Sequence, residues 1–166
     1  MGGAVDEATH TLYVARMGTG DVNALHGTSS SVFPAGHTPC AVAIDPRIHA
    51  VYVANYADGS VTTLDQTGRS VATVPVGVDP QALAVDLQRG LIYVANTSSG
   101  TVTGIDAERK KPAATFRAGT APYALAVDPG SSRLYVANEA DDQGLTIVET
   151  KLPQDPTRMQ TSESLA

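Results

Sequence analysis

The sequence is poor in the features that mark several common classes of protein. It contains one cysteine, Cys40, which excludes an internal disulfide framework and any CxxC metal site and leaves the redox compartment open. Acidic residues outnumber basic ones by 17 to 11, so no positively charged surface for nucleic acid or an anionic membrane is expected. No segment approaches the roughly 18 apolar residues of a membrane helix. We therefore expect no nucleic-acid partner and no membrane insertion.

Known targeting and catalytic motifs are also missing. The start, MGGAVDEATHTL, has no basic region followed by an apolar stretch, so no signal peptide is expected in this chain. The sequence has no G-x-S-x-G, HExxH, P-loop or dinucleotide-binding glycine motif. We expect no cofactor, no metal ligands and no catalytic residues. The sequence therefore favours a protein that is not an enzyme, although it leaves that question open.

What the sequence does contain is a repeat of about 40 residues. One motif recurs as LYVAR from Leu12, VYVAN from Val51, IYVAN from Ile92 and LYVAN from Leu134. A second motif, G-x-x-P, begins at Gly36, Gly77 and Gly119 and precedes an Ala-rich segment that ends in Asp. Two motifs that keep one period along the chain indicate a repeat protein. The 166 residues, 42% of them hydrophobic, suffice for one globular unit.

Each repeat has the pattern of four short strands separated by turns. In the second repeat we predict strands over 40–45, 50–55, 60–65 and 70–76. The first alternates Ala with larger residues, as expected of an inner strand, and the second is apolar on both faces, as expected between stacked sheets. The fourth is more polar and indicates an outer edge. The predicted fold is an all-β β-propeller with four consecutive four-stranded antiparallel blades, over about 1–36, 37–77, 78–119 and 120–150.

The sequence does not show how such a propeller closes. Residues 151–166 are polar and are expected to form a disordered tail, with TRMQT at 157–161 as a weaker candidate for the fourth strand of the last blade. Without a clasp between the first and last blades, we expect an open arc, either part of a larger ring or a unit that pairs with a second copy; a tight four-bladed ring is the alternative. The outer faces would then expose Tyr13, Val14, Tyr135 and Val136.

The motifs Y-V-A-N and G-x-x-P-x-A-x-A-V/I-D resemble the YVTN family of β-propeller repeats, whose members are often described as YncE-like. The resemblance runs from Ala4 to about Thr150, nearly the whole chain. It implies a propeller scaffold, typically of seven blades, and a parent protein that is periplasmic, secreted or on the cell surface. It implies a fold far more strongly than a chemistry.

Residues that recur once per repeat are expected to be structural. Asn55, Asn96 and Asn138 end the second strand of their repeats, where Asn can bond its own backbone and tolerate turn dihedrals. The aspartates that end the first strand are expected to be turn residues; they are Asp6, Asp45, Asp86 and Asp128. Cys40 is expected to be a small buried side chain rather than a nucleophile.

Function is expected where the repeats differ, in the loops of one rim. The resemblance places the G-x-x-P connections and the turns between second and third strands on that rim. The candidate ligand-binding residues there are Arg16, Asp21, His37, Tyr56, Asp58, Asp79, Asp141 and Asp142. The set is mainly acidic, which favours a cationic ligand or a weak metal site, against the alternative of a solvated surface. His10 and His49 fall on the opposite rim and are not expected to share a metal with His37.

Two functional hypotheses remain at this point. The favoured one is a non-catalytic scaffold that binds a protein or a small molecule on the loop face. The alternative is part of a lactonase- or lyase-like propeller enzyme, because such enzymes resemble this fold and assemble a metal site at the ring centre from several blades. Sequence spacing does not distinguish these two hypotheses.

Overall fold

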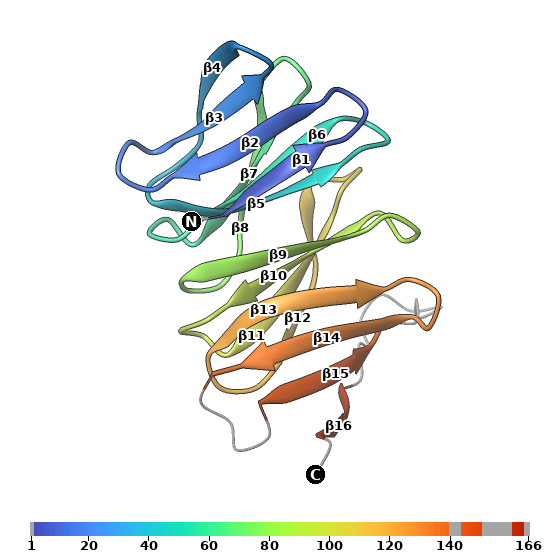
Figure 1. The fold of residues 1–166 in the computed structure, drawn as a ribbon. Helices are drawn as coiled ribbons and strands as arrows, with labels where there is room; N and C mark the ends of the chain where they lie inside the picture. The colour runs from blue at the N-terminus through green and yellow to red at the C-terminus, as the bar shows by residue number, and fades with distance from the viewer. Residues whose placement is uncertain (1, 140–143, 151–160, 165–166) are drawn as a thin grey trace.

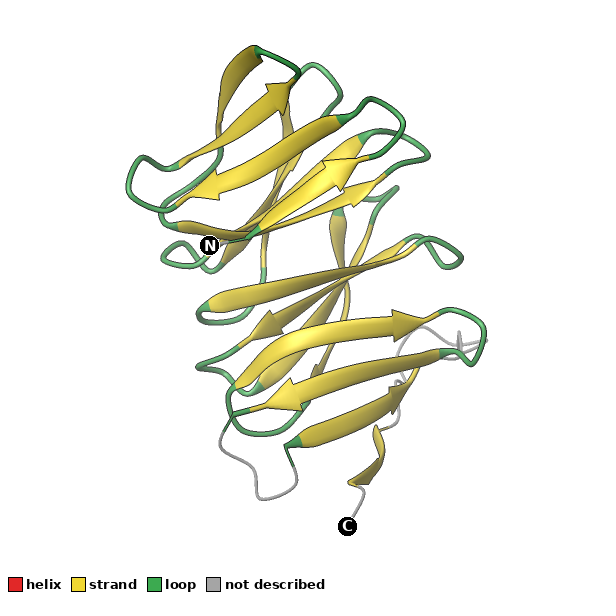
Figure 2. Ribbon diagram, in the orientation of Figure 1, coloured by secondary structure: helices red, strands yellow, loops and turns green. Residues whose placement is uncertain are grey.

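The computed structural model describes residues 2–139, 144–150 and 161–164, and these residues form sixteen strands and no helix (Figure 2). The strands make four antiparallel sheets of four strands, each in chain order (Figure 1). Blade one contains β1 (Gly3–Asp6), β2 (Thr11–Arg16), β3 (Asp21–His26) and β4 (Ser29–Pro34). Blade two contains β5 (Pro39–Asp45), β6 (Ala50–Asn55), β7 (Ser60–Leu64) and β8 (Ser70–Pro75).

Blades three and four follow the same plan. Blade three contains β9 (Pro80–Asp86), β10 (Leu91–Asn96), β11 (Thr101–Asp106) and β12 (Lys111–Arg117). Blade four contains β13 (Pro122–Asp128), β14 (Arg133–Asn138), β15 (Leu145–Glu149) and β16 (Thr161–Ser164). The predicted fold class, four consecutive four-stranded antiparallel blades, is confirmed. No helix in the described residues is long or apolar enough to cross a membrane.

The described part of the C-terminal tail supplies the fourth strand of blade four. Strand β16 pairs antiparallel with β15, with Thr146 opposite Ser164 and Val148 opposite Thr161. TRMQT is predicted as the weaker candidate for this strand, but that segment lies outside the described residues except for Thr161. The strand falls a few residues later, in a polar segment without the alternation that identified the other strands.

The cores lie between successive blades, because each interior sheet buries both faces. Tyr13 of blade one packs against Val51 and Val53 of blade two, and Tyr52 of blade two packs against Ile92 of blade three. A third core joins blade three to blade four, with Tyr93 among its members. The tyrosine of each YVA motif therefore faces the next blade, and the residue before it faces the previous blade.

Burial is greatest in the second strand of each interior blade, is lower in the inner strand, and is lowest in the outer strand. All six residues of β6 and all six of β10 are buried, as expected for strands covered by a sheet on each face. The outer strand β4 is almost entirely exposed, and β12 is mostly so. The outer edges are thus the polar strands of the repeat.

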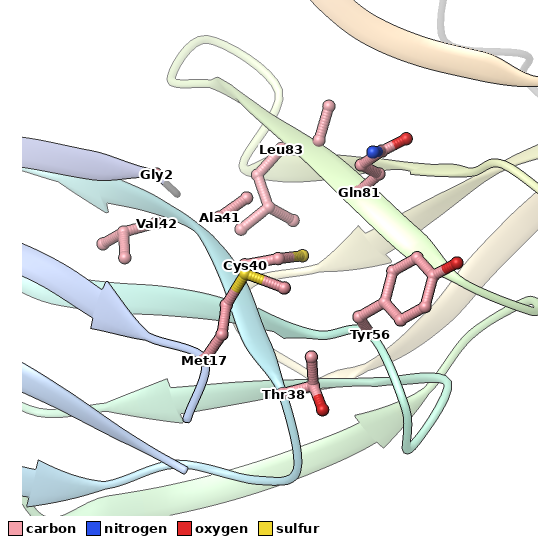
Figure 3. A pocket seen from close by; sticks show the side chains of 10 residues that line it. Gly2, Met17, Thr38, Cys40, Ala41, Val42, Tyr56, Gln81 and Leu83 are labelled. Atoms are coloured by element: carbon pink, nitrogen blue, oxygen red, sulfur yellow. The ribbon is translucent and has the colours of Figure 1, made fainter. Parts of the chain in front are cut away.

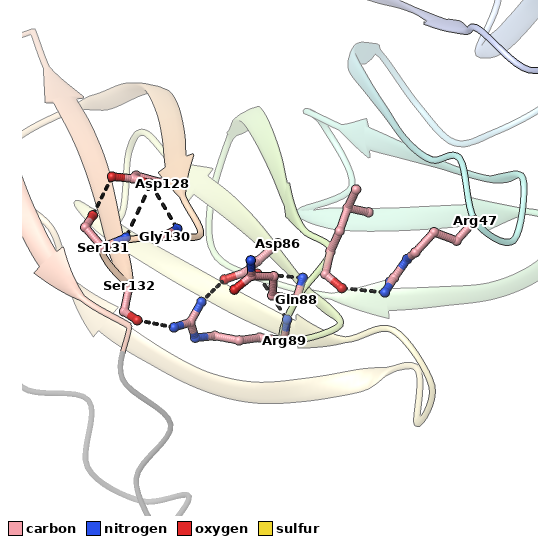
Figure 4. Close-up of polar contacts among 9 residues, drawn as sticks. Arg47, Asp86, Gln88, Arg89, Asp128, Gly130, Ser131 and Ser132 are labelled. Carbon is pink, nitrogen blue, oxygen red and sulfur yellow. Dashed lines mark hydrogen bonds and ion pairs between the residues drawn. The ribbon is translucent and has the colours of Figure 1, made fainter.

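The aspartates that end the inner strands form side-chain turns, as predicted. Asp45 Oδ1 accepts the backbone N–H of Arg47, and Asp86 Oδ1 accepts those of Gln88 and Arg89, as Figure 4 shows for the second of these turns. The turn ends in a residue with positive φ at the same place in every blade; these residues are His10, His49, Gly90 and Ser132. The turn is therefore a constant part of the blade.

The recurring asparagines are structural, but not in the way we expected. Asn55 is fully buried at the end of β6, and its Nδ2 donates to the hydroxyls of Ser60 and Thr62 on β7. Asn96 donates to the equivalent pair in blade three. The side chain bonds the neighbouring strand rather than its own backbone, because the residue is still within the sheet.

The arc is open, since the three cores join only consecutive blades among the described residues and blades one and four lie apart (Figure 1). The expectation that Tyr13 and Val136 would be exposed was wrong: both are buried against a neighbouring blade. Side chains alternate along a strand, so only every second residue of an end blade faces outward.

We define the two outward surfaces by residues that share a sheet face through cross-strand register. The end face of blade one consists of Val5, Leu12, Val14, Leu25 and Val32. The end face of blade four consists of Ala126, Tyr135, Ala137, Leu145 and Ile147. These residues are apolar and several are exposed; the same registers add Asn23 and Ser30 to the first face, and Arg133 and Glu149 to the second.

Candidate functional site

A β-bulge near the start of the inner strand sets up the site. In blade two, Pro39 pairs with Asn55 and Ala41 pairs with Ala54, so Cys40 is left between them without a strand partner. Gln81 and Tyr123 take the same place in blades three and four. A bulge redirects the side chain of the extra residue. This position varies in chemistry from blade to blade while the strands around it repeat.

The G-x-x-P connection is tied to the end of the second strand. Thr38, Asp79 and Ala121, which precede the proline, all have φ between 54° and 56°. The carbonyl of Thr38 accepts the N–H of Tyr56, and the carbonyl of Asp79 accepts the N–H of Thr97. Because the conformation recurs in three blades, it belongs to the fold and is not a strain confined to one functional site.

A hollow of about 540 Å³ lies where these features of blades two and three meet. Its base is apolar, with Val42 and Leu83 from the two inner strands, and Cys40 and Gln81 come from the two bulges (Figure 3). Tyr56 lies at its margin, near Thr38 and Gln81 in the view of Figure 3.

A second hollow of about 570 Å³ lies on the rim between the same two blades. Tyr56 lines this hollow too, together with Asp58, Asp79 and Ser99. Tyr56 therefore lines both a hollow between the inner strands and a groove on the rim that carries two carboxylates. Of the predicted candidates, the structure brings these three together: Tyr56, Asp58 and Asp79.

Asp79 is the carboxylate that most affects the pKa of Tyr56. Its negative charge is the main cause that raises the pKa of the Tyr56 phenol, and burial and a hydrogen bond between the two side chains add to it. Asp79 also accepts a hydrogen bond from the hydroxyl of Ser98. The Tyr56 phenol thus stays a neutral hydrogen-bond donor at neutral pH.

Asp58 and His37 have a structural use. Asp58 Oδ2 accepts the N–H of His37 at 2.7 Å, and its Oδ1 lies 2.7 Å from His37 Nδ1. These bonds from the His37 backbone and ring lower the pKa of Asp58. In the next blade Ser99 Oγ accepts the N–H of Val78 in the same way, so this contact anchors the connection between blades.

Arg16 and Asp21 form a closed pair in blade one, away from the groove. Arg16 Nε lies 2.5 Å from Asp21 Oδ1, and its Nη2 lies 2.8 Å from Oδ2, so both charges are used. The hydrogen bond from Arg16 is the largest cause of the lowered pKa of Asp21. Arg16 opposite Asp21 replaces the Asn55 and Ser60 pair of blade two at the same register.

The remaining candidates add little to the groove. Asp141 and Asp142 lie outside the described residues. Cys40 is half-buried, its Sγ lies 3.1 Å from the carbonyl of Pro80, and burial is the main cause that raises its pKa, so the thiol is neutral. In the described part of the chain, no three His, Cys, Asp or Glu side chains gather as a metal site would require.

Sequence reasoning passed over Gln81 and Met17, which line the hollow between blades two and three. The signal for both was available: each occupies a position that differs in every blade inside a strict repeat. Met17 occupies the position of Tyr56 in blade one, and Gln81 the position of Cys40 in blade three. Gln81 lies within a strand, outside the loops where function was expected, whereas Met17 lies in a loop like Tyr56 and could have been identified by the same reasoning.

No protein-family model and no curated protein matches the chain. Among solved structures it is similar to hydrazine synthase from Kuenenia stuttgartiensis, with a TM-score of 0.79 and 17% identity over 89% of this chain and 44% of that one. It is also similar to a functionally unknown protein from Desulfotomaculum acetoxidans DSM 771, with a TM-score of 0.77 and 13% identity over 98% and 54%. The chain thus spans about half the length of each. At these identities the likeness concerns the fold alone, and the chain is a four-bladed arc of the β-propeller type.

Proposed function

We propose that the chain is a non-catalytic binding scaffold whose ligand lies on the rim between blades two and three. The observation that carries the proposal is the position of Tyr56, which lines both hollows and lies beside Asp79. An aromatic ring that lines both a hollow with an apolar base and a groove with two carboxylates gives a ligand both a surface to pack on and a charge to pair with.

The chemistry of the groove favours a small organic cation. Asp58 and Asp79 line it, and among the described residues no Lys or Arg does. A cation over the ring of Tyr56 gains a cation–π contact, and the carboxylate of Asp79 adds a charge-assisted hydrogen bond when the cation carries N–H groups. The apolar base formed by Val42 and Leu83 suits the uncharged part of such a ligand.

The test is calorimetric titration with choline and with its uncharged isostere dimethylbutanol. We expect choline to bind and dimethylbutanol to bind at least about tenfold more weakly, a ratio that corresponds to the loss of one such contact. Equal binding of the two compounds would contradict the proposal. The proposal would also fail if neither compound bound and no member of a panel of primary amines bound.

Two pairs of variants locate the site. Tyr56→Leu and Asp79→Asn should each weaken binding, and Asn tolerates the positive φ of position 79. The matched controls are Tyr123→Leu, an exposed tyrosine on the bulge of blade four, and Asp65→Asn in a turn outside the groove. Metal-dependent ring-opening of a lactone, lost in Asp79→Asn, would instead support the enzyme alternative.

We also propose that the repeats are of the YVTN type and that the protein acts in the periplasm or outside the cell. Support comes from the position of both motifs, since Y-V-A-N fills the second strand and G-x-x-P the connection to the inner strand in blade after blade. Fractionation of the source cells, with an antibody against this chain, tests the location. A signal found only in the cytoplasmic fraction would contradict it.

A further inference from the structure

The end faces of blades one and four are the two halves of an interface that the chain already forms three times. Within the arc, the tyrosine face of each blade packs on the receiving face of the next blade, which carries Val51, Ile92 or Leu134. Among the described residues, no blade packs on the tyrosine face of blade four. None packs on the receiving face of blade one.

The end faces are more exposed to solvent than the same repeat positions in blades that have a neighbour on that side. Leu12 is 37% exposed, whereas Val51, Ile92 and Leu134 at its position are 0–1% exposed. Val5 and Val32 on the same end face are 56% and 51% exposed. On blade four, Leu145 is 37% exposed, and Tyr135 is half-buried where Tyr52 and Tyr93 are fully buried.

The aspartates that end the inner strands show the same difference in exposure between blade four and the other blades. Asp6, Asp45 and Asp86 are 0–2% exposed because the following blade covers the turn. Asp128, at the same position of blade four, is exposed. In blades one to three, the following blade covers both the equivalent apolar face and the turn carboxylate. In blade four, the carboxylate is exposed.

The polar contacts between blades show which residue the missing blade should carry. Asp6 pairs with His49 of blade two at 2.7 Å, and blade one has no arginine in that turn. Where the following blade carries Gly90 or Ser132 at the position of His49, an arginine makes the link instead. Arg47 donates to the Leu87 carbonyl of blade three, and Arg89 donates to the Ser132 hydroxyl of blade four (Figure 4).

The turn of blade four resembles that of blade one, because neither contains an arginine. It carries Asp128 with Gly130 and Ser131 at the positions of the two arginines, and Asp128 Oδ2 accepts the Ser131 hydroxyl at 2.6 Å. Because the turn has no arginine that could reach a following blade, it matches a blade with histidine at the position of His49. The remaining blade in the chain with histidine there is blade one, whose His10 is exposed and has positive φ like His49. The turn residues therefore match blade four to blade one.

We propose that two copies of the chain associate head to tail, with blade four of each on blade one of the other. The two contacts are related by a twofold axis and close a ring of eight blades, within the range that propellers adopt. In each contact Asp128 of one copy lies beside His10 of the other, and Tyr135 packs on Leu12.

Light scattering after size exclusion tests the proposal on the whole chain. We expect a mass twice that of the 17.1 kDa chain at micromolar concentration. Leu12→Glu and Tyr135→Glu should each give the mass of one chain, because every contact in the ring needs both residues. Ile48→Glu, at a 58% exposed site in a turn of blade two, is the matched control and should keep the double mass.

Mixing the two single-chain variants distinguishes head-to-tail association from other arrangements. The Leu12→Glu chain keeps an intact blade four and the Tyr135→Glu chain an intact blade one, so an equal mixture should regain the double mass through one contact. A wild-type chain that stays single overturns the proposal and leaves the end faces to further blades or another protein. So does a double mass that Tyr135→Glu does not reduce, which indicates contact between two copies of blade one. Masses above two chains overturn the closed ring, since an open head-to-tail contact forms filaments.

Discussion

The imidazole Nδ1 of His49 lies 2.7 Å from Oδ2 of Asp6, although the two residues are 43 positions apart in the chain. Asp6 is buried in the turn of blade one, and His49 projects onto it from the same turn of blade two. This contact is the polar counterpart of the apolar core between the two blades. Its strength can be measured, because blade one offers a histidine in the same backbone position without an aspartate from a preceding blade.

We expect His49→Ala to reduce the free energy of unfolding by about 1–3 kcal/mol, since it leaves a buried carboxylate without its partner. His10→Ala is the control, because both residues have φ near 50° and the strain of an alanine there is the same. Urea denaturation of both variants in a Leu12→Glu chain removes any contribution from self-association. Equal losses in the two variants would show that the backbone position, and not the contact with Asp6, accounts for the effect.

Stability should fall with acid through Asp6. Burial by itself raises the pKa of this carboxyl, but hydrogen bonds from His49, Thr9 and Ala8 outweigh it and leave the pKa below its ordinary value of 3.8. The folded state therefore takes up the proton less readily than the unfolded state. The stabilisation is present above the ordinary pKa and is lost as the pH falls through the lowered one. Urea midpoints measured from pH 7 down to pH 2.5 should fall less steeply in Asp6→Asn, and an unchanged slope would contradict this assignment.

Gly77 should tolerate no side chain. A Cβ built on it lies 2.7 Å from the side chain of Asn96 and 2.5 Å from Ser99 Oγ, closer than packed atoms allow. We expect Gly77→Ala to cost about 1–3 kcal/mol of stability by overpacking. Gly18→Ala is the control, because nothing lies within 4 Å of the added methyl group and φ is not positive, and it should change stability by less than about 0.5 kcal/mol. A similar small effect at both positions would refute the contact between Gly77 and Asn96.

Loss of the buried amide at the end of β6 should be costly. Asn55→Ala removes two hydrogen bonds to Ser60 and Thr62 and leaves both hydroxyls without this donor, so we expect a loss of about 1–3 kcal/mol. Asn23→Ala, whose amide accepts a bond from the exposed Ser30 hydroxyl, should cost under about 0.5 kcal/mol. Thermal and urea unfolding of the two variants, again in the Leu12→Glu chain, provide the comparison. If Asn55→Ala were as stable as wild type, the hydrogen bonds of the Asn55 amide would contribute nothing to the stability of the fold.

The sequence allowed the blades to be predicted because period, alternation and turn residues are local and repeated. The prediction of 50–55 as a strand coincides with β6, and burial of its full length followed from apolar residues on both faces. What a repeat hides is the specific partner of each side chain. Asn55 and Arg16 occupy one register position, and the sequence alone did not show that one donates to hydroxyls while the other closes an ion pair.

The candidate site was predictable only in outline. Tyr56 and Asp79 were identified as loop residues that break the repeat, and the structure places them together. Asp58 was identified by the same reasoning, yet its carboxylate also anchors the backbone of His37. The bulge that puts Cys40 and Gln81 into the hollow depends on a pairing shift between strands, which no pattern of apolar residues records.

The three separate cores make this protein a linear series of nearest-neighbour units rather than a single cooperative mass. Blades two and three are held from two sides, and blades one and four from one side in a lone chain. Backbone amides in β6 and β10 should therefore exchange with solvent most slowly, and those of the end blades should open first. Closing the series on itself would remove that difference, so that the ends of the chain gain most of the protection that a ring confers.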